Sequence, residues 1–426
     1  MISNKQFIAI DLGSSRISAI AAEMQKNGAL KILSEEHKPS DDIKWGIVEQ
    51  VSGAAFKINE CNKLLQNSAK IPENSMISIA IGAKSMKTIS VSVSRFVGKP
   101  NIVTESLLED ILEECRKKSE KPDITIFDII PLSYMLDGKR MDEPVGKPGT
   151  QITANYNVII GHSIIKAEIA RCIDRTGIRL EYSPLAMEAL STVLLEEQER
   201  EDGCALINFG ATTTSLAVYF EGVIQNLMVV PLGAKNITKD IQELGISEAN
   251  AERLKCLKGI ALESLVLQPI YVQIPSDEDI NVPVRISTKF LATIIEARLE
   301  EILQPIFETI QNLPFSLEAG IVITGGGSKL SNILDFISEK TDIYTRFGDH
   351  SEWLSDDTPE QYLDPHFAQL IGTVILTDEY RKQHPIEETV KKTDEIIKLP
   401  GGKGRKIKDK ITKGLFDFFN DDNKMN

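Results

Sequence analysis

Two short segments share one pattern, and this repeat constrains the fold more than any other feature of the sequence. Residues 7–19 read FIAIDLGSSRISA, and residues 205–217 read ALINFGATTTSLA. In each, apolar residues that alternate with others predict a strand, a glycine and small residues predict a tight turn, and a second strand follows. Such a pattern, recurring about 200 residues later, is typical of two similar halves. We therefore expect an α/β protein with two lobes and one such turn in each.

The residues of the two turns suit a bound anion. Gly13 and Gly210 allow close approach of the backbone, and neighbouring N–H and hydroxyl groups, such as those of Ser14 and Ser15, can face a phosphate. Asp11 is placed to hold a water-shelled Mg²⁺. The first turn alone is better explained by an ordinary hairpin, but the second copy favours a phosphate chain held between the two turns.

A third candidate site follows a short apolar strand. Residues 319–330 read AGIVITGGGSKL, so three glycines separate this strand from an expected helix that includes Leu330 and Ile333. Bare glycines at this place permit contact with a flat base or a phosphate. The alternative is a flexible turn.

Length and composition narrow the class of protein. A chain of 426 residues is too long for one core and predicts two to four domains. The net charge of −14 argues against general nucleic-acid binding. Five scattered cysteines without a CxxC motif fit a reducing cytosol, with neither a disulfide framework nor a structural metal. No apolar run approaches the length of a membrane span.

The order of the elements predicts how the lobes are divided. We expect the first lobe at 1–82 and 164–204, closed by a helix at 365–381, and an inserted small α+β subdomain at 83–163. The second lobe is expected at 205–244 and 311–364, with a smaller subdomain at 245–310. The main helices are expected at 104–118, 163–176, 184–200, 248–257 and 287–310, the last with Phe290 on its apolar side.

The end of the chain differs from the rest. Residues 382–404 are polar and rich in glycine and proline, as in a linker, and residues 405–420 predict a short basic amphipathic helix. Its apolar stripe and its basic cluster consist, respectively, of Ile407, Ile411, Leu415, Phe418 and Phe419, and of Lys406, Lys410 and Lys413. A helix of this kind is typical of an interfacial anchor on anionic membrane lipid; a soluble core helix is the alternative.

Several motifs together resemble the FtsA family of bacterial cell-division proteins, which have the fold of the actin-like ATPases. They are FDIIPLSYMLDG at 127–138 with EPVG at 143–146, SPLA at 183–186 and AERLK at 251–255. The resemblance covers nearly the whole chain. It implies ATP between the lobes, Glu252 and Lys255 beside the ribose and base, and Gly325, Gly326, Gly327 and Ser328 beside the adenosine. The phosphate contacts it implies are Gly13, Ser14, Ser15, Gly210, Ala211, Thr212 and Thr213, and Gly233 is a further candidate.

The resemblance also implies partners. Members of the family polymerise, bind the C-terminal peptide of the tubulin homologue FtsZ, here through 245–310, and tether it to the cytoplasmic membrane at the division site. The subdomain at 83–163 would meet other division proteins.

Two departures from the family pattern concern hydrolysis. Asn208 replaces the usual aspartate of the second turn, and Ser183 stands where relatives with clear hydrolysis often have glutamate. Asparagine can contact a metal-bound water but carries no charge. We therefore expect ATP binding with slow or undetectable hydrolysis. The alternatives are an actin-fold kinase or phosphatase, which needs a second carboxylate, and an actin-like scaffold of a pilus-assembly platform, which lacks the basic tail.

Overall fold

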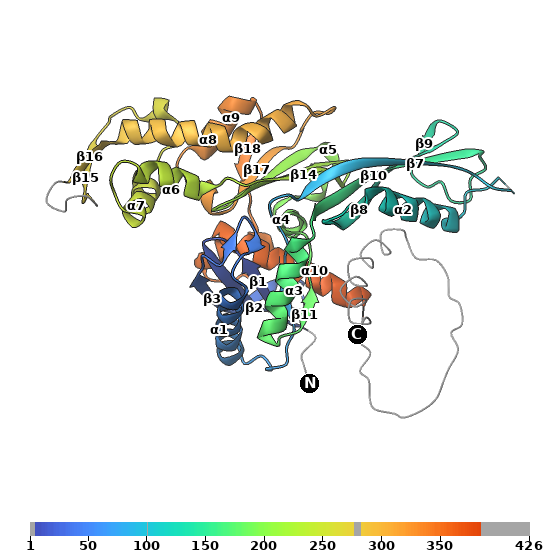
Figure 1. The fold of residues 1–426 in the computed structure, drawn as a ribbon, viewed down its shortest axis with the longest axis horizontal. Coiled ribbons are helices and arrows are strands. Elements are labelled where there is room, and N and C mark those ends of the chain that lie inside the picture. Colours follow the sequence, from blue (N-terminus) through green and yellow to red (C-terminus); the bar gives the residue numbers. More distant parts are fainter. Residues whose placement is uncertain (1–4, 100, 277–282, 385–426) are drawn as a thin grey trace.

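The structure, a computed structural model, describes residues 5–99, 101–276 and 283–384. The amphipathic helix predicted at 405–420 therefore lies outside the described residues, and so does the predicted linker, except for Lys382 and Gln383, which belong to the last helix, and His384, which caps it. Two sheets organise the chain (Figure 1): one of five strands, and one of nine strands that extends across the molecule above it.

The five-stranded sheet carries the first turn. Its order is β11-β6-β1-β2-β3, and β1 and β2 form an antiparallel hairpin. Ile10, Ile17 and Ile20 are fully buried in this hairpin, which fixes the turn between them on a rigid base. The strands are β1 (Gln6–Leu12), β2 (Arg16–Met24), β3 (Leu30–Pro39), β6 (Ile77–Ile79) and β11 (Leu180–Tyr182), and the helices that pack with them are α1 (Val51–Ala69), α3 (Ile164–Thr176), α4 (Ala186–Leu194) and α10 (Ala368–Gln383).

The nine-stranded sheet carries the second turn. Its order is β18-β17-β12-β13-β14-β7-β10-β8-β9. One face contributes Leu206, Ala217 and Val322 to the core of the first lobe, and the other packs under α8 and its neighbours. The strands are β7 (Lys87–Phe96), β8 (Ile124–Leu136), β9 (Lys139–Met141), β10 (Gln151–His162), β12 (Cys204–Phe209), β13 (Thr214–Phe220), β14 (Val223–Val230), β17 (Gly320–Thr324) and β18 (Thr345–Phe347).

The remaining elements lie on or beside these sheets. The helices are α2 (Glu105–Ser119), α5 (Glu197–Asp202), α6 (Ala234–Gln242), α7 (Glu248–Lys258), α8 (Thr288–Gln311) and α9 (Ile333–Thr341), with short 3-10 helices η1 (Glu263–Leu265), η2 (Gly326–Lys329), η3 (Ser351–Trp353), η4 (Glu360–Leu363) and η5 (Pro365–Phe367). Two small hairpins, β4 (Ile43–Lys44) with β5 (Ile47–Val48) and β15 (Tyr271–Ile274) with β16 (Val284–Ser287), complete the described residues.

The inserted segment joins the sheet of the second lobe, although we expected a separate small unit. Met228 of β14 pairs with Lys87 of β7. Beside this pair the buried Asn157 side chain donates to the carbonyl oxygens of Ile224 and Gln225, at 3.2 and 2.7 Å. The two parts thus share backbone hydrogen bonds as well as a boundary. The domain limits given above stay predictions.

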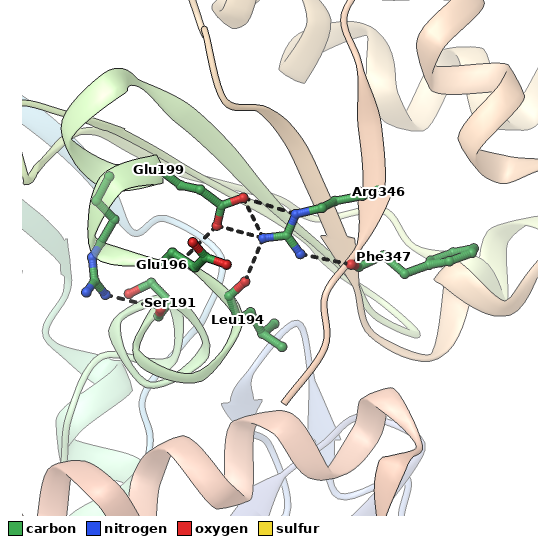
Figure 2. A network of polar contacts seen from close by, with 7 residues as sticks. Ser191, Leu194, Glu196, Glu199, Arg346 and Phe347 are labelled. Atoms are coloured by element: carbon green, nitrogen blue, oxygen red, sulfur yellow. Dashed lines mark hydrogen bonds and ion pairs between the residues drawn. The ribbon is translucent and has the colours of Figure 1, made fainter. Parts of the chain in front are cut away.

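A guanidinium network joins the two lobes at the edge strand β18 (Figure 2). Arg346 donates through Nη2 to both carboxylate oxygens of Glu199 at 2.6 Å and to the Leu194 carbonyl oxygen at 3.1 Å. Because Leu194 ends α4 and Glu199 lies in α5, one side chain of the second lobe holds the connection from the first.

Most predicted helices are present, but three local predictions were wrong. The helix expected at 184–200 is interrupted, because a capping box of Glu196 and Glu199 begins a new helix. Phe290 is 52% exposed instead of facing the core. Leu330 precedes α9, since the glycines form a 3-10 turn. None of the described helices is long and apolar enough to cross a membrane.

Candidate nucleotide site

The first turn is a tight connection between β1 and β2. A Cβ at Gly13 would lie 2.6 Å from the Arg16 carbonyl oxygen, so only glycine fits there without a shift of the backbone. Ser14 is half-buried and Ser15 is exposed. Both serines are therefore reachable from solvent, as the prediction of a phosphate contact requires.

The second turn connects β12 to β13 and rests on the start of α6. Gly210 N–H donates to the Thr213 carbonyl oxygen at 2.9 Å, and the Gly210 carbonyl accepts from Ala234 N–H at 3.0 Å. A Cβ at Gly233 would lie 2.6 Å from that same carbonyl oxygen. Gly233, a candidate ligand contact, thus serves the packing of the turn against α6, while Ala211, Thr212 and Thr213 stay half-buried.

One segment of the first lobe touches both turns. Ser40 N–H donates to the Ser15 carbonyl oxygen at 3.0 Å. Five residues later, Trp45 N–H donates to Thr212 Oγ1 of the second turn at 3.1 Å. We call residues 40–46 the bridging segment. The two turns, far apart in sequence, are therefore brought to the same place in the fold.

The three glycines after β17 lie against the second turn. A Cβ at Gly325, where φ is +89°, would lie 2.4 Å from Asn208 Oδ1, and one at Gly327 would meet the Phe209 ring at 2.5 Å. Ser328 is buried and its hydroxyl donates to the Gly325 carbonyl oxygen at 2.7 Å. Gly326 is exposed, with nothing within 4 Å of a Cβ added there. Of the four predicted residues, Gly326 is the one whose surface is open to a ligand.

Glu252 and Lys255 form the ion pair that their spacing allows, but their roles differ. The buried Lys255 ammonium donates to Glu252 Oε2 at 2.7 Å, to Thr238 Oγ1 at 2.8 Å and to the Ala234 carbonyl oxygen at 3.1 Å. These bonds occupy its three protons, so Lys255 ties α7 to α6. Burial alone would raise the pKa of Glu252, but the hydrogen bonds from Lys255 and Thr238 leave it lowered. Glu252 is charged, and its side chain is 48% exposed.

The carboxylate of Asp11 is poorly solvated. Gln369 Nε2 of α10 donates to Asp11 Oδ1 at 2.7 Å. Burial raises the pKa of Asp11 to about 6, although Arg16 and the bond from Gln369 favour the charged form. A cation would stabilise this carboxylate, so Asp11 fits the predicted water-mediated contact with Mg²⁺. Nothing in the local sequence indicated Gln369, which lies at the far end of the chain.

A hollow of about 500 Å³ between the lobes contains groups that the sequence did not reveal. Arg16 and His366 of the first lobe line it together with Lys329, which follows the glycines. Lys329 pairs with Asp364. Burial would raise the pKa of Asp364, but the bonds from Lys329 and His366 lower it to about 2. This ion pair ties the turn after the glycines to the segment that leads into α10.

Comparison with known proteins places this geometry in a family. The family model described as "Cell division protein FtsA" matches residues 205–372, and the one described as "SHS2 domain inserted in FTSA" matches residues 84–160. The chain belongs to the FtsA family. The resemblance stated from the motifs is confirmed, and the inserted segment of this FtsA-family chain is an SHS2 domain.

Relatives support the same assignment along the chain. The cell division protein FtsA of Neisseria meningitidis is 28% identical over 382 residues, covering 87% of this chain and 90% of that protein. The FtsA of Borreliella burgdorferi is 26% identical, covering 93% of this chain and 97% of that protein.

Solved structures identify the fold. A chain of the PilM–PilN type IV pilus biogenesis complex superposes with a TM-score of 0.63 at 15% identity, covering 88% of this chain and 99% of that one. MreB5 of Spiroplasma citri bound to ADP gives 0.54 at 14% identity, covering 90% and 99%. At these identities the likeness shows the fold alone. The predicted two-lobed actin-like α/β fold with an inserted subdomain is confirmed.

The raised pKa of Asp11 makes stability depend on pH. The folded state holds the Asp11 proton more tightly than the unfolded chain does, so ionisation destabilises the folded protein as pH rises from 3.8 through about 6. We expect Asp11→Asn, without ligand, to raise the free energy of unfolding by up to about 3 kcal/mol above pH 7, and this gain to disappear toward pH 4.

Urea unfolding across this pH range measures the difference between variant and parent. Asp41→Asn is the control, because the Asp41 side chain is 97% exposed and its charge should matter by less than about 1 kcal/mol. A variant no more stable than the parent above pH 7 would contradict the prediction.

Proposed function

We propose that this FtsA-family protein binds ATP between its lobes, polymerises, and tethers FtsZ to the cytoplasmic membrane at the division site. Family membership supports a role in cell division. The observation that carries nucleotide binding is the bridging segment, whose contacts with Ser15 and Thr212 bring the two turns together. In the same fold, MreB5 of Spiroplasma citri has been solved with ADP and with AMPPNP.

Different residues would contact different parts of the proposed ligand. The turns at 13–15 and 210–213 would hold the phosphates, Gly326 would face the adenosine, and Glu252 would contact the ribose. Mg²⁺, bound through water at Asp11, would neutralise phosphate charge. Lys255 and Gly233 would act indirectly, by holding α7 and the second turn against α6.

Slow hydrolysis follows from the same side chains. Asn208 supplies no negative charge, and its Oδ1 lies toward Gly325. Within the described part of the chain, the Ser183 hydroxyl is buried without a hydrogen-bond partner, and a hydroxyl is a poor general base. We therefore propose that ATP favours the closed state and self-association, with little turnover.

The open face at Gly326 provides a test of nucleotide binding. Gly326→Val should fold normally, because nothing lies within 4 Å of the added Cβ, and should weaken Mg·ATP binding at least about tenfold by intruding on the ligand. Calorimetric titration measures the affinity. Gly98→Val in the inserted domain, where the added Cβ also meets open space, is the control. Unchanged affinity in Gly326→Val would refute this placement of the nucleotide.

Exposed apolar side chains within 245–310 are the proposed surface for the FtsZ peptide. The side chains of Leu267, Tyr271 and Phe290 are 87%, 61% and 52% exposed. Large apolar side chains exposed close together in the sequence or fold are typical of a binding surface. Ile270 and Thr288 exchange hydrogen bonds, which places this part of the chain beside the start of α8. Arg285 lies over the Tyr271 ring at 4.1 Å and adds positive charge. The patch suits a peptide with apolar anchors and acidic groups.

Leu267→Glu should lower the affinity for an FtsZ C-terminal peptide at least about tenfold, because it replaces the most exposed apolar side chain of this surface with a charged one. Fluorescence anisotropy with a labelled peptide measures this. Phe96→Glu is the matched control, since Phe96 is an 81% exposed aromatic residue on the inserted domain, where we propose that other division proteins bind. An equal loss in both variants would show that the peptide does not select this patch.

The C-terminal segment is proposed as the lipid contact. With each lysine near an anionic leaflet adding about 1 kcal/mol, the segment at 405–420 suffices for reversible attachment. Deletion of residues 405–426 should abolish co-sedimentation with vesicles containing phosphatidylglycerol, and Phe418→Glu with Phe419→Glu should weaken it strongly. Asp421→Asn with Asp422→Asn, beyond the apolar stripe, should not weaken it. Vesicle binding that persists after the deletion would count against this segment as the lipid contact.

A further inference from the structure

The bridging segment is built firmly into the first lobe. Asp42 is buried, its carboxylate is 2.7 Å from Lys57 Nζ, and its carbonyl oxygen accepts from Glu49 and Gln50 N–H. A Cβ at Gly53 would lie 2.1 Å from Asp42 Oδ1, so α1 begins directly against this carboxylate. The base of the segment therefore moves with α1 and the first sheet.

The tip of the segment is a two-residue hairpin turn in an unusual conformation. Trp45 and Gly46, between β4 and β5, have φ values of +54° and +76°. Positive φ at both positions is what a type I′ turn requires, and glycine or asparagine is usual there. A tryptophan costs free energy in this region and needs support from its neighbours.

Two lysines supply this support. Lys84 N–H donates to the Trp45 carbonyl oxygen at 2.8 Å. The ammonium groups of Lys84 and Lys44 lie 3.7 and 4.3 Å from the centre of the indole ring. The ring of Trp45 is thus held by Lys44 of the first lobe and, with its carbonyl, by Lys84 where the chain passes from the first lobe into the inserted segment, while its N–H points across to the second lobe.

The bond from Trp45 determines what the Thr212 hydroxyl can do. Its oxygen accepts the Trp45 N–H, so its single proton remains to be donated to another group. A hydroxyl that accepts a hydrogen bond is polarised and donates more strongly. Thr212 is half-buried, and a ligand between the turns could receive that proton.

We propose that the bridging segment sets the spacing of the two turns, and that Trp45 is a positioning residue whose amide orients the Thr212 hydroxyl toward a phosphate. This inference rests on the proposed function for the identity of the ligand. The indole, fixed to one lobe and bonded through its own amide to the other, then senses nucleotide binding. Lys235, whose Nζ is 3.7 Å from Asp41, adds a second contact from the segment to the second lobe.

Tryptophan fluorescence tests the proposal in the full-length protein. The chain has two tryptophans, and Trp353→Phe leaves Trp45 as the reporter. Within the described residues, Trp353 Nε1 is buried without a partner, so its removal should be tolerated. In this parent, ATP should shift Trp45 emission and reduce its quenching by acrylamide. Thr212→Ser, which keeps the hydroxyl, should behave in the same way.

Thr212→Val, nearly equal in shape, should increase Trp45 quenching in the ligand-free protein, abolish the ATP-dependent shift at equal occupancy, and weaken ATP binding by calorimetry. A thermal melt verifies the folding of each variant.

The outcomes separate this proposal from the proposed function. Absence of calorimetric ATP binding in the parent would refute the nucleotide proposal and the sensing role with it. Equal ligand-free quenching in the parent and Thr212→Val would overturn the bridge, whether or not ATP binds. A shift that persists in Thr212→Val at equal occupancy would overturn the positioning role.

Discussion

The hydrogen bond from Trp45 to Thr212 makes one site out of two turns. Each turn is fixed by its own hairpin, in its own sheet, and neither hairpin pairs with the other. The bridging segment connects the two turns, because it is also bonded to the first one. There, Ser40 N–H donates to the Ser15 carbonyl oxygen. A repeat within one chain can thus become a site only through a third segment, which belongs to neither copy.

Burial of the Asp11 carboxylate gives the candidate site a group that a metal cation would stabilise. Asp11 is destabilised as an anion by burial, and only Arg16 and Gln369 offset this. The equivalent position in the second turn is the neutral Asn208. With one carboxylate rather than two, less charge is buried in the ligand-free site, and the proposed Mg²⁺ would be held from one lobe alone. A second carboxylate is expected of a site that hydrolyses ATP, and Asn208 does not supply one. The side chains of the candidate site therefore suit ATP binding better than hydrolysis.

The sequence could predict those parts of the site that depend on local chemistry. Glycines are needed at 13, 210 and 325 because the backbone is crowded there. A glycine directly after a predicted strand indicates such a place in the sequence. It could not reveal Gln369, because a side chain reaching the site from a distant element leaves no local signal. Nor could it show that Lys329, next to the glycines, pairs with Asp364. Nor could it separate Gly326 from its neighbours: which of three glycines faces outward depends on Phe209 and Asn208 filling the inner side. The same limit applies to Phe290, since helical periodicity shows a stripe but not what covers it.

The sheet topology determines which contacts of the inserted domain a movement of one lobe relative to the other would affect. β14 pairs with β13 beside the second turn and with β7 of the insert at Met228, so these parts share hydrogen bonds. The insert also buries Phe127 and Ile159 in the core of the first lobe. It is therefore held on both sides, by backbone pairing on one and by apolar packing on the other. Hydrogen-bonded pairing is directional, whereas apolar contacts tolerate small sliding. A rotation between the lobes would therefore have to strain the pairing of β14 with β7 or slide the apolar contact between the SHS2 domain and the first lobe.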